Sequence, residues 1–239
     1  MDTIEIQLNQ LRLHGMKQSW QNLVLTRKQF DFSLSEGLDL LLDAEILERN
    51  NRRLSRLQKD AKFRYQATIE QLKYDPSRGL DKSMIQSLAT CQYVKDGASI
   101  IITGATGCGK SYIASAFGHQ ACLLGHKVLY FSMHKLMLHT KMARIDGTIY
   151  KYIDKLAKSE LLIIDDFGLA HLDKQQQMDL MEIIEDRHGK NATIIASQLP
   201  VSAWFDIIGE PTIADAILDR LAHTSYKIEI KGDSLRKNR

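Results

Sequence analysis

The sequence predicts an α/β fold in which helices cover both faces of a central parallel sheet. Three observations lead to this prediction. Apolar, β-branched segments alternate with helical segments along most of the chain, which is the order expected of βαβ units. The apolar segments are continuous rather than alternating, as in strands buried on both faces. A glycine-rich loop joins the first of these segments, which begins at residue 99, to a helix.

That loop matches the pattern G-x-x-x-x-G-K-[ST], which binds phosphate groups where it follows a strand and opens a helix. Its glycines allow backbone N–H groups to surround phosphate oxygens. Lys110 supplies a positive charge for the β- and γ-phosphates, and the Ser111 hydroxyl is a candidate Mg²⁺ ligand. A simple strand-to-helix turn is disfavoured, because every fixed position of the pattern is filled. The candidate nucleotide-binding residues are Gly104, Ala105, Thr106, Gly107, Cys108, Gly109, Lys110, Ser111 and Tyr112.

The composition is that of an ordinary soluble protein, with 239 residues of which 44% are hydrophobic and 26% charged. No apolar run approaches the ~20 residues that span a bilayer, and the N-terminus lacks an apolar signal core. The cysteines Cys91, Cys108 and Cys122 lack the spacing of a metal site and suit a reducing compartment. We therefore expect a cytoplasmic protein without a membrane partner. A net charge of +3 does not by itself indicate nucleic acid.

Residues 1–62 are expected to form a small helical domain, and residues 63–239 a nucleotide-binding domain. Apolar residues recur at helical spacing within residues 1–30. The sequence Ser33-x-x-Glu36 has the form of a capping box ahead of a second helix, over residues 38–62.

The second half of that helix is basic. Such a row of cations is either a solvated helix surface, paired with Glu45 and Glu48, or a ridge that contacts DNA phosphates without reading sequence. The spacing leaves both interpretations open. Lys141 and Arg144, in a later basic connection, are further candidates for backbone contact. The row consists of Arg49, Arg52, Arg53, Arg56, Lys59 and Lys62.

The remaining elements are predicted from apolar runs, helical periodicity and the turn residues between them. Strands are expected over 128–131, 161–166, 192–198 and 225–230, and helices over 81–93, 112–124, 134–142, 148–158, 174–189 and 212–223, with a short helix around Trp204.

Two adjacent carboxylates, Asp165 and Asp166, end the strand over 161–166. Asp165 is the expected Mg²⁺ partner of Ser111, and Asp166 could orient and deprotonate an attacking water. A pair of solvent-facing acids at a strand end is the alternative, but two adjacent carboxylates repel one another unless a cation neutralises them.

A complete strand–helix unit, residues 128–158, lies between Lys110 and Asp165. This order fits a sheet in which another strand separates the phosphate-loop strand from the acidic strand, and residues 192–198 are the natural candidate. The polar end of that strand, Ser197-Gln198, could then reach the γ-phosphate or the water, with the Gln198 amide able to donate and to accept. The alternative is an ordinary end of a core strand.

Arg220 lies late in the chain on a predicted helix. Its forked guanidinium suits a transferring phosphoryl group. The alternative is a surface residue paired with Asp215 or Asp219, and the sequence leaves both open. Arg187 is the next candidate for the same role.

Several of these motifs together resemble the AAA+ ATPases of the IstB/DnaC branch, and most of all the IstB-like ATP-binding proteins of insertion sequences. The resemblance covers nearly the whole chain. The segments that carry it are Gly104-x-x-Gly107-x-Gly109-Lys110-Ser111, Leu161 to Gly168, Thr193 to Pro200, Ala216 to Leu221 and the tail from Lys231 to Arg236.

The resemblance implies an AAA+ P-loop three-layer sandwich with ATP and Mg²⁺ bound between subunits of a homo-oligomer. By position it implies Walker A roles for Lys110 and Ser111, Walker B roles for Asp165 and Asp166, sensor 1 for Gln198, and for Arg220 an arginine finger that reaches a neighbouring subunit's nucleotide. Asp166 stands where the family generally has Glu, and Gln198 where it has Asn or another small polar residue. We expect no C-terminal lid domain, because few residues follow Arg220.

The function implied is that of an ATP hydrolase that assembles on duplex DNA with ATP and assists transposition by recruiting or activating a transposase. One alternative is a DnaC-like loader of a replicative helicase. A second is a P-loop kinase or a nucleotide-binding regulator that does not bind DNA.

Overall fold

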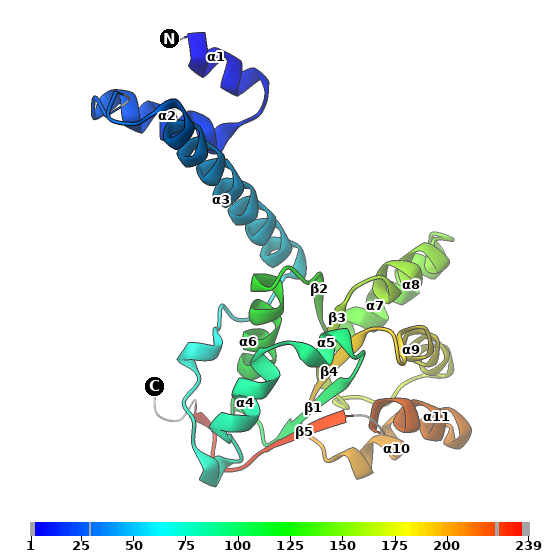
Figure 1. The fold of residues 1–239 in the computed structure, drawn as a ribbon. Coiled ribbons are helices and arrows are strands. Elements are labelled where there is room, and N and C mark those ends of the chain that lie inside the picture. The colour runs from blue at the N-terminus through cyan, green and yellow to red at the C-terminus, as the bar shows by residue number, and fades with distance from the viewer. Residues whose placement is uncertain (1–2, 29, 223–224, 236–239) are drawn as a thin grey trace. The chain divides into compact units, whose positions relative to one another are not determined.

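A computed structural model describes residues 3–28, 30–222 and 225–235 (Figure 1). The chain divides into two compact units, Met1–Arg56 and Leu57–Arg239. The sequence places the boundary after residue 62 instead. The division after Arg56 falls inside one long helix, α3 (Leu34–Ala61), whereas the predicted boundary falls just after that helix ends.

The first unit is helical. It contains α1 (Thr3–Gln10), α2 (His14–Leu25) and most of α3. The expectation of one helix over residues 1–30 is wrong, because the chain breaks at Arg12, whose φ is +59°. The N–H of Leu13 bonds the carbonyl of Leu8, which is the pattern that closes a helix end.

Two carboxylates stabilise helix starts in this unit. The capping box before α3 is confirmed, since Ser33 N–H bonds Glu36 Oε2 at 2.8 Å and Glu36 N–H bonds Ser33 Oγ at 3.3 Å. Buried Glu45 accepts from the N–H groups of Gly15 and Met16, in the first turn of α2. Gly15 permits this close approach, because a Cβ there would lie 2.3 Å from the carbonyl oxygen of Ala44.

The second unit is built on a sheet whose described strands number five, all parallel, in the order β2-β3-β4-β1-β5. The predicted interposition is confirmed: β4 lies between the phosphate-loop strand β1 and the acidic strand β3. The strands are β1 (Ser99–Gly104), β2 (Val128–Ser132), β3 (Leu161–Phe167), β4 (Ala192–Ser197) and β5 (Ser225–Ile230).

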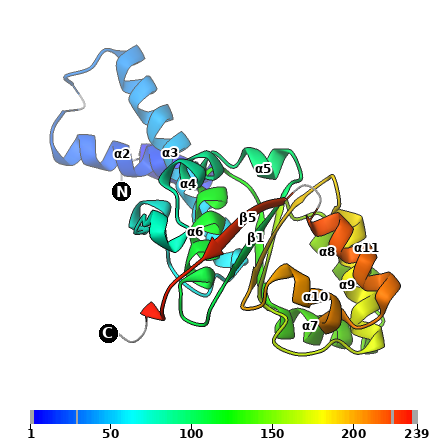
Figure 2. The same cartoon turned by 90° about the horizontal axis from the view of Figure 1, so that it is seen from below.

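Helices lie on both faces of this sheet, which makes the three-layer α/β fold that the sequence predicts. In Figures 1 and 2, α4 to α6 cover one face and α7 to α11 the other. They are α4 (Lys82–Ala89), α5 (Gln92–Lys95), α6 (Lys110–Leu123), α7 (Met133–Ile145), α8 (Ile149–Ala157), α9 (Lys174–Arg187), α10 (Trp204–Ile208) and α11 (Pro211–Ala222), with 3₁₀ turns at Ile69–Gln71, Pro76–Arg78 and Val201–Ala203.

Two helical predictions in this unit need correction. The helix expected over 81–93 is broken at Cys91, whose φ is +56°, into α4 and α5. The helix expected from residue 112 begins at Lys110, directly after Gly109 in a left-handed conformation.

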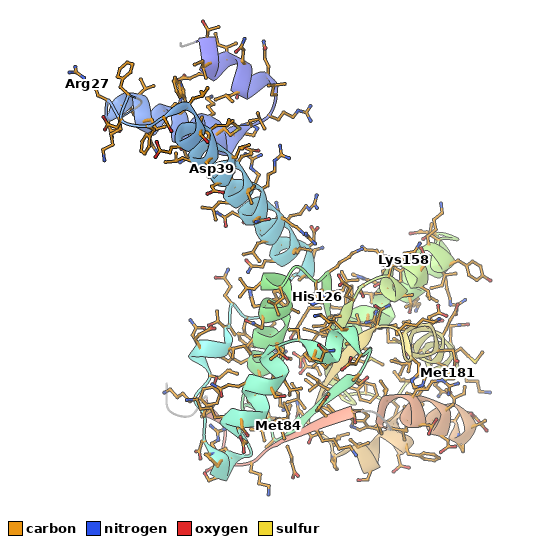
Figure 3. All side chains as sticks on the ribbon, viewed as in Figure 1. Arg27, Asp39, Met84, His126, Lys158 and Met181 are labelled. Carbon is orange, nitrogen blue, oxygen red and sulfur yellow. The ribbon has the colours of Figure 1, made fainter. Side chains whose placement is uncertain are left out.

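Apolar side chains fill the space between the sheet and its helices (Figure 3). On one face, residues of β1, β3 and β4 join those of α7 to α11 in one buried cluster that includes Trp204. His126, labelled in Figure 3, lies at the amino end of β2, where its Nδ1 is 2.6 Å from Glu160 Oε1. The phosphate loop and the acidic pair lie at the opposite, carboxyl ends of their strands, where parallel sheets bind ligands.

No helix in the described part of the chain combines the length and the apolar character that membrane crossing demands.

Candidate nucleotide-binding site

The phosphate loop joins β1 to α6, as the motif requires. Gly104, Gly107 and Gly109 have φ values of +148°, +82° and +108°, which side chains rarely adopt. A Cβ on Gly104 would lie 2.4 Å from the carbonyl oxygen of Ile230. The loop conformation therefore depends on glycine through both its dihedrals and its close contacts.

Lys110 is 6% exposed and folds back onto the loop. Its Nζ donates 2.8 Å hydrogen bonds to the carbonyl oxygens of Gly104 and Ala105. The ammonium group is thus held beside the loop amides by carbonyls that a phosphate oxygen could replace as its partner.

A cavity of about 370 Å³ opens over the loop and brings most of the predicted site residues together. It adjoins a second cavity of about 440 Å³, because Gly109, Tyr112 and Leu235 line both. Apolar side chains of Leu72, Leu80 and Ile113 contribute to the second cavity. The residues lining the first are Arg64, Tyr65, Thr106, Gly107, Gly109, Lys110, Ser111, Tyr112, Asp166, Leu169, Gln198 and Leu235.

The acidic pair lies at the end of β3. Asp165 is fully buried, and its Oδ2 accepts a 2.5 Å hydrogen bond from the hydroxyl of Tyr130, while its Oδ1 accepts from the N–H of Asp166 at 2.8 Å. Burial and the neighbouring Asp165 charge raise the pKa of Tyr130 far above its ordinary value, so that the phenol stays a donor. The pairing of β3 with β4 shifts register between Ile164 and Phe167, and Asp166 has a φ of +55°.

Gln198 follows β4 and lines the first cavity. Its Oε1 accepts a 2.5 Å hydrogen bond from Thr106 Oγ1 in the phosphate loop. This contact is possible because β4 pairs directly with β1.

Arg64 is a site residue that the sequence does not mark. Its Nη1 lies 2.8 Å from Asp166 Oδ2 and 3.3 Å from Asp165 Oδ2. Burial by itself would lower the pKa of Arg64, but the hydrogen bond and charge of Asp166 outweigh it and raise the pKa above its ordinary value. A lone arginine in the segment after the basic helix carries no pattern that marks it as part of a site.

The chain after β5 also returns to the phosphate loop. Leu235 N–H bonds the carbonyl of Gly107 at 3.0 Å. Arg78 bridges the same regions, because its carbonyl accepts from Lys231 N–H and its Nη2 donates to the carbonyl of Cys108. The tail resemblance extends to Arg236, which is outside the described residues.

The two candidate arginines have different surroundings. Arg220 lies on α11, where Nη2 is 2.5 Å from Glu185 Oε2 and Nη1 donates to the carbonyl of Ala216, and it is not among the residues that line either cavity. Arg187 is 1% exposed and donates to carbonyls of Leu156, Ser159 and Ala192. Arg187 therefore holds backbone carbonyls at the ends of α8 and β4 and between α8 and β3, and it is not among the residues that line either cavity.

The basic row is exposed throughout; five of its members lie on α3, and Lys62, with a φ of +57°, directly follows the helix. Two of its members form pairs along the helix, Arg49 with Glu45 at 2.8 Å and Arg52 with Glu48 at 2.6 Å. The structure thus contains the pairs of the solvated-surface interpretation, while Arg56, Lys59 and Lys62 are also exposed.

The second basic region lies on α7, where Lys141 and Arg144 are exposed. The Nε of Arg144 donates to Asp179 Oδ1 at 2.9 Å, and Asp179 is 1% exposed. Its guanidinium is therefore committed to a buried carboxylate.

Comparison with known proteins identifies the family. The sequence model of the IstB-like ATP binding protein family matches residues 6–239. The chain belongs to this family. It is 42% identical over 231 residues to a Sinorhizobium fredii protein named insertion sequence ATP-binding protein y4pL, covering 97% of this chain and 94% of that protein. A Pseudomonas fluorescens protein named as the ATP-binding protein of insertion sequence IS1162 is 40% identical over 197 residues, covering 82% and 85%.

Solved structures confirm the AAA+ fold of this IstB-like chain. The crystal structure of the DnaC helicase loader superposes with a TM-score of 0.59 at 20% identity, covering 70% of this chain and 98% of that chain. Aquifex aeolicus DnaA bound to AMPPCP superposes with a TM-score of 0.61 at 19% identity, covering 73% and 53%.

The residues of the IstB-like site fit a nucleotide and Mg²⁺. The glycines leave a cradle of backbone amides that side chains would fill. Ser111 and Asp165 offer a hydroxyl and a carboxylate, the hard oxygen donors that Mg²⁺ prefers together with phosphate oxygens. Lys110 supplies the cation that motif chemistry places beside the β- and γ-phosphates.

Proposed function

We propose that this IstB-like protein is an Mg²⁺-dependent ATP hydrolase that assembles as a homo-oligomer on duplex DNA and assists transposition by recruiting or activating a transposase. The observation that carries the proposal is similarity over nearly the whole chain to proteins named for insertion sequences and ATP binding, combined with an intact phosphate loop.

The geometry supports a division of labour in the site. Lys110 and the loop amides bind the phosphates, and the partly apolar second cavity accepts the base. Ser111 and Asp165 would hold Mg²⁺, and a bound ion would neutralise charge on the phosphate oxygens. Asp166 orients the attacking water, because its carboxylate lines the cavity and its side chain is 27% exposed.

The oligomer is part of the proposal because Arg220 is not among the described residues that line the two cavities over the phosphate loop. As an arginine finger it would act on the nucleotide of a neighbouring subunit. The exposed row from Arg49 to Lys62, with Lys141, supplies the proposed contacts with DNA phosphates, and Arg144 is withdrawn as a contact because its guanidinium already pairs with Asp179.

Light scattering of the purified protein tests the assembly. We expect a larger particle when duplex DNA and AMPPCP are both present than with either one alone, together with ATPase activity on Mg²⁺–ATP. Lys110→Ala should abolish nucleotide binding, whereas the exposed control Lys95→Ala should bind like the wild type. A protein that stays monomeric with both ligands contradicts the proposal.

A DnaC-like helicase loader is the second candidate, favoured by the superposition on DnaC, whose chain is covered almost completely. Binding assays with the transposase and with the replicative helicase of the same cell separate the two. Stable binding of the helicase alone would favour the loader.

A further inference from the structure

Arg64 makes a contact that the proposed function must break. Its guanidinium contacts both Asp165 and Asp166. The proposed function assigns Asp165 to the metal ion and Asp166 to the attacking water. Asp165, with a side chain only 1% exposed, gains a neighbouring positive charge from the guanidinium. A divalent cation between Ser111 and Asp165 would supply the same neutralisation, so the guanidinium and the cation compete for Asp165.

The backbone around Arg64 is anchored. The preceding Phe63 packs on α6, where its ring centroid is 4.4 Å from that of His119. Gly118 makes room for this ring, because a Cβ there would lie 2.3 Å from Phe63 Cε1. By contrast, the side chain of Arg64 is 41% exposed, which leaves it space to change rotamer without moving the backbone.

An alternative partner for Arg64 would lie in the same cavity. Arg64 lines this cavity together with Lys110, Ser111 and Gln198. Its contact with Asp166, the proposed water-orienting residue, places it toward the γ-phosphate end of a bound nucleotide. A guanidinium fork matches the oxygens of a terminal phosphate, which a diphosphate does not present at this position.

We propose that Arg64 is an intrachain sensor of the γ-phosphate: its guanidinium exchanges between the contact with Asp165 and Asp166 and a contact with the terminal phosphate of a bound triphosphate. This inference rests on the proposed ATP site. It makes Arg64 a contributor to the preference for triphosphate over diphosphate, separate from the intersubunit role proposed for Arg220.

Competition binding with a fluorescent nucleotide tests the inference, with AMPPCP and ADP as the two ligands. In Mg²⁺ buffer, Arg64→Ala should weaken AMPPCP binding about tenfold, as expected for one charge-assisted contact. ADP affinity should change by less than about twofold, because the contact is specific for the γ-phosphate. Lys95→Ala, which removes an exposed charge outside both cavities, should change neither affinity.

The same measurement in EDTA gives a readout that a purely structural arginine would not move. Without Mg²⁺, the Ala variant has neither cation to neutralise the acidic pair beside the triphosphate. Mg²⁺ should therefore strengthen AMPPCP binding by a larger factor in Arg64→Ala than in the wild type. Arg64→Lys, which retains the charge but loses the fork, should fall between the two and serves as the test if the Ala variant does not fold.

The inference is overturned if the ratio of AMPPCP affinity to ADP affinity in Arg64→Ala equals that of the wild type. If only Arg64→Lys folds, the same comparison is made with that variant. If the ratios are equal and Lys110→Ala still loses nucleotide binding, the proposed ATP site stands and only the role of Arg64 is wrong. If Lys110→Ala binds both nucleotides like the wild type, the ATP site itself is wrong, and the inference fails with it.

Discussion

Thr106 Oγ1 donates a 2.5 Å hydrogen bond to Gln198 Oε1, although the two residues are 92 positions apart in the sequence. The bond joins the phosphate loop to the end of β4, which pairs with β1 up to Thr103 and Ser197. If the phosphate loop moves when it binds phosphate, the side-chain amide of Gln198, which lines the same cavity, would therefore move with it.

This relationship predicts separable effects on binding and turnover. Gln198→Ala should lower kcat of ATP hydrolysis by about a hundredfold, in the range measured when one positioned transition-state donor is removed. The affinity for AMPPCP should change little, because Lys110 and the loop amides remain. Thr106→Val, which removes only the orienting bond, should lower kcat in the same direction but less. Unchanged kcat in Gln198→Ala would exclude a role for Gln198 in hydrolysis.

Gly107 and Gly147 form a matched pair for testing whether contact with the chain after β5 shapes the phosphate loop. Both have positive φ, +82° and +67°, so alanine strains the backbone at each by about 1–2 kcal/mol. Only at Gly107 would the new Cβ meet another group, Ser234 Oγ at 2.1 Å, whereas nothing lies within 4 Å at Gly147.

We expect both alanine variants to lower the thermal midpoint, but only Gly107→Ala to weaken nucleotide binding, by about tenfold or more if the loop and tail separate. Nucleotide titration and thermal melting of the two variants side by side measure the difference. Equal nucleotide affinity in the two variants would mean that tail contact does not shape the loop.

His119 makes stability depend on pH. Partial burial beside Phe63 lowers the pKa of His119 below its ordinary value of 6.5. The unfolded chain therefore binds a proton at His119 more readily than the folded chain does. The folded state keeps its full stability above about pH 6.5, where the imidazole is neutral in both states, and loses stability as pH falls toward the folded-state pKa. His119→Gln should flatten the decline of the thermal midpoint between about pH 6.5 and 5 by a few degrees. The exposed control His188→Gln should keep the wild-type slope.

The sequence predicts the sheet and the phosphate loop well, because both leave local signals. Buried strands such as β3 are continuous apolar runs, and the loop needs glycine wherever φ is positive. The position of β4 between β1 and β3 followed from chain order alone, which is why Gln198 could be placed beside the loop in advance.

The features that the sequence could not predict depend on contacts rather than on patterns. Arg64 meets Asp165 across 101 residues, and it does so because Phe63 packs against Gly118. The helix breaks at Arg12 and Cys91 occur at residues that are not glycine, so no residue type marks their left-handed φ.

The basic row on α3 predicts a salt-dependent DNA affinity. Replacing Arg52, Arg56 and Lys59 together by alanine should weaken duplex binding and reduce the slope of log K against log salt by about 0.9 for each phosphate that the variant no longer neutralises. Arg52 should contribute least, because Glu48 already accepts from it at 2.6 Å. Fluorescence anisotropy across a salt series measures the slope.

The charge-matched control is the triple alanine variant at Lys95, Lys158 and Lys190, all exposed, with Lys158 labelled in Figure 3. Equal slopes in both triple variants would remove the row from the interface.

Arg220 allows a test of the intersubunit site by mixing two inactive proteins. Lys110→Ala is expected to lose nucleotide binding but retains Arg220, whereas Arg220→Ala retains the phosphate loop but lacks the proposed finger. Each chain alone should be inactive. In a randomly mixed head-to-tail oligomer about a quarter of the interfaces combine an intact loop with an intact finger, so activity should return to about that fraction of the wild type.

The ion pair between Arg220 and Glu185 provides a control variant for that experiment. Glu185→Ala removes the intrachain partner of Arg220, which lies 2.5 Å away, without removing the guanidinium. If Arg220 acts on a neighbouring subunit, Glu185→Ala should retain turnover while Arg220→Ala loses it. If the ion pair only fastens α11 to α9, the two variants should lose stability alike, and mixing with Lys110→Ala should restore nothing. Steady-state ATPase rates and thermal midpoints of the single variants and the mixture distinguish these outcomes.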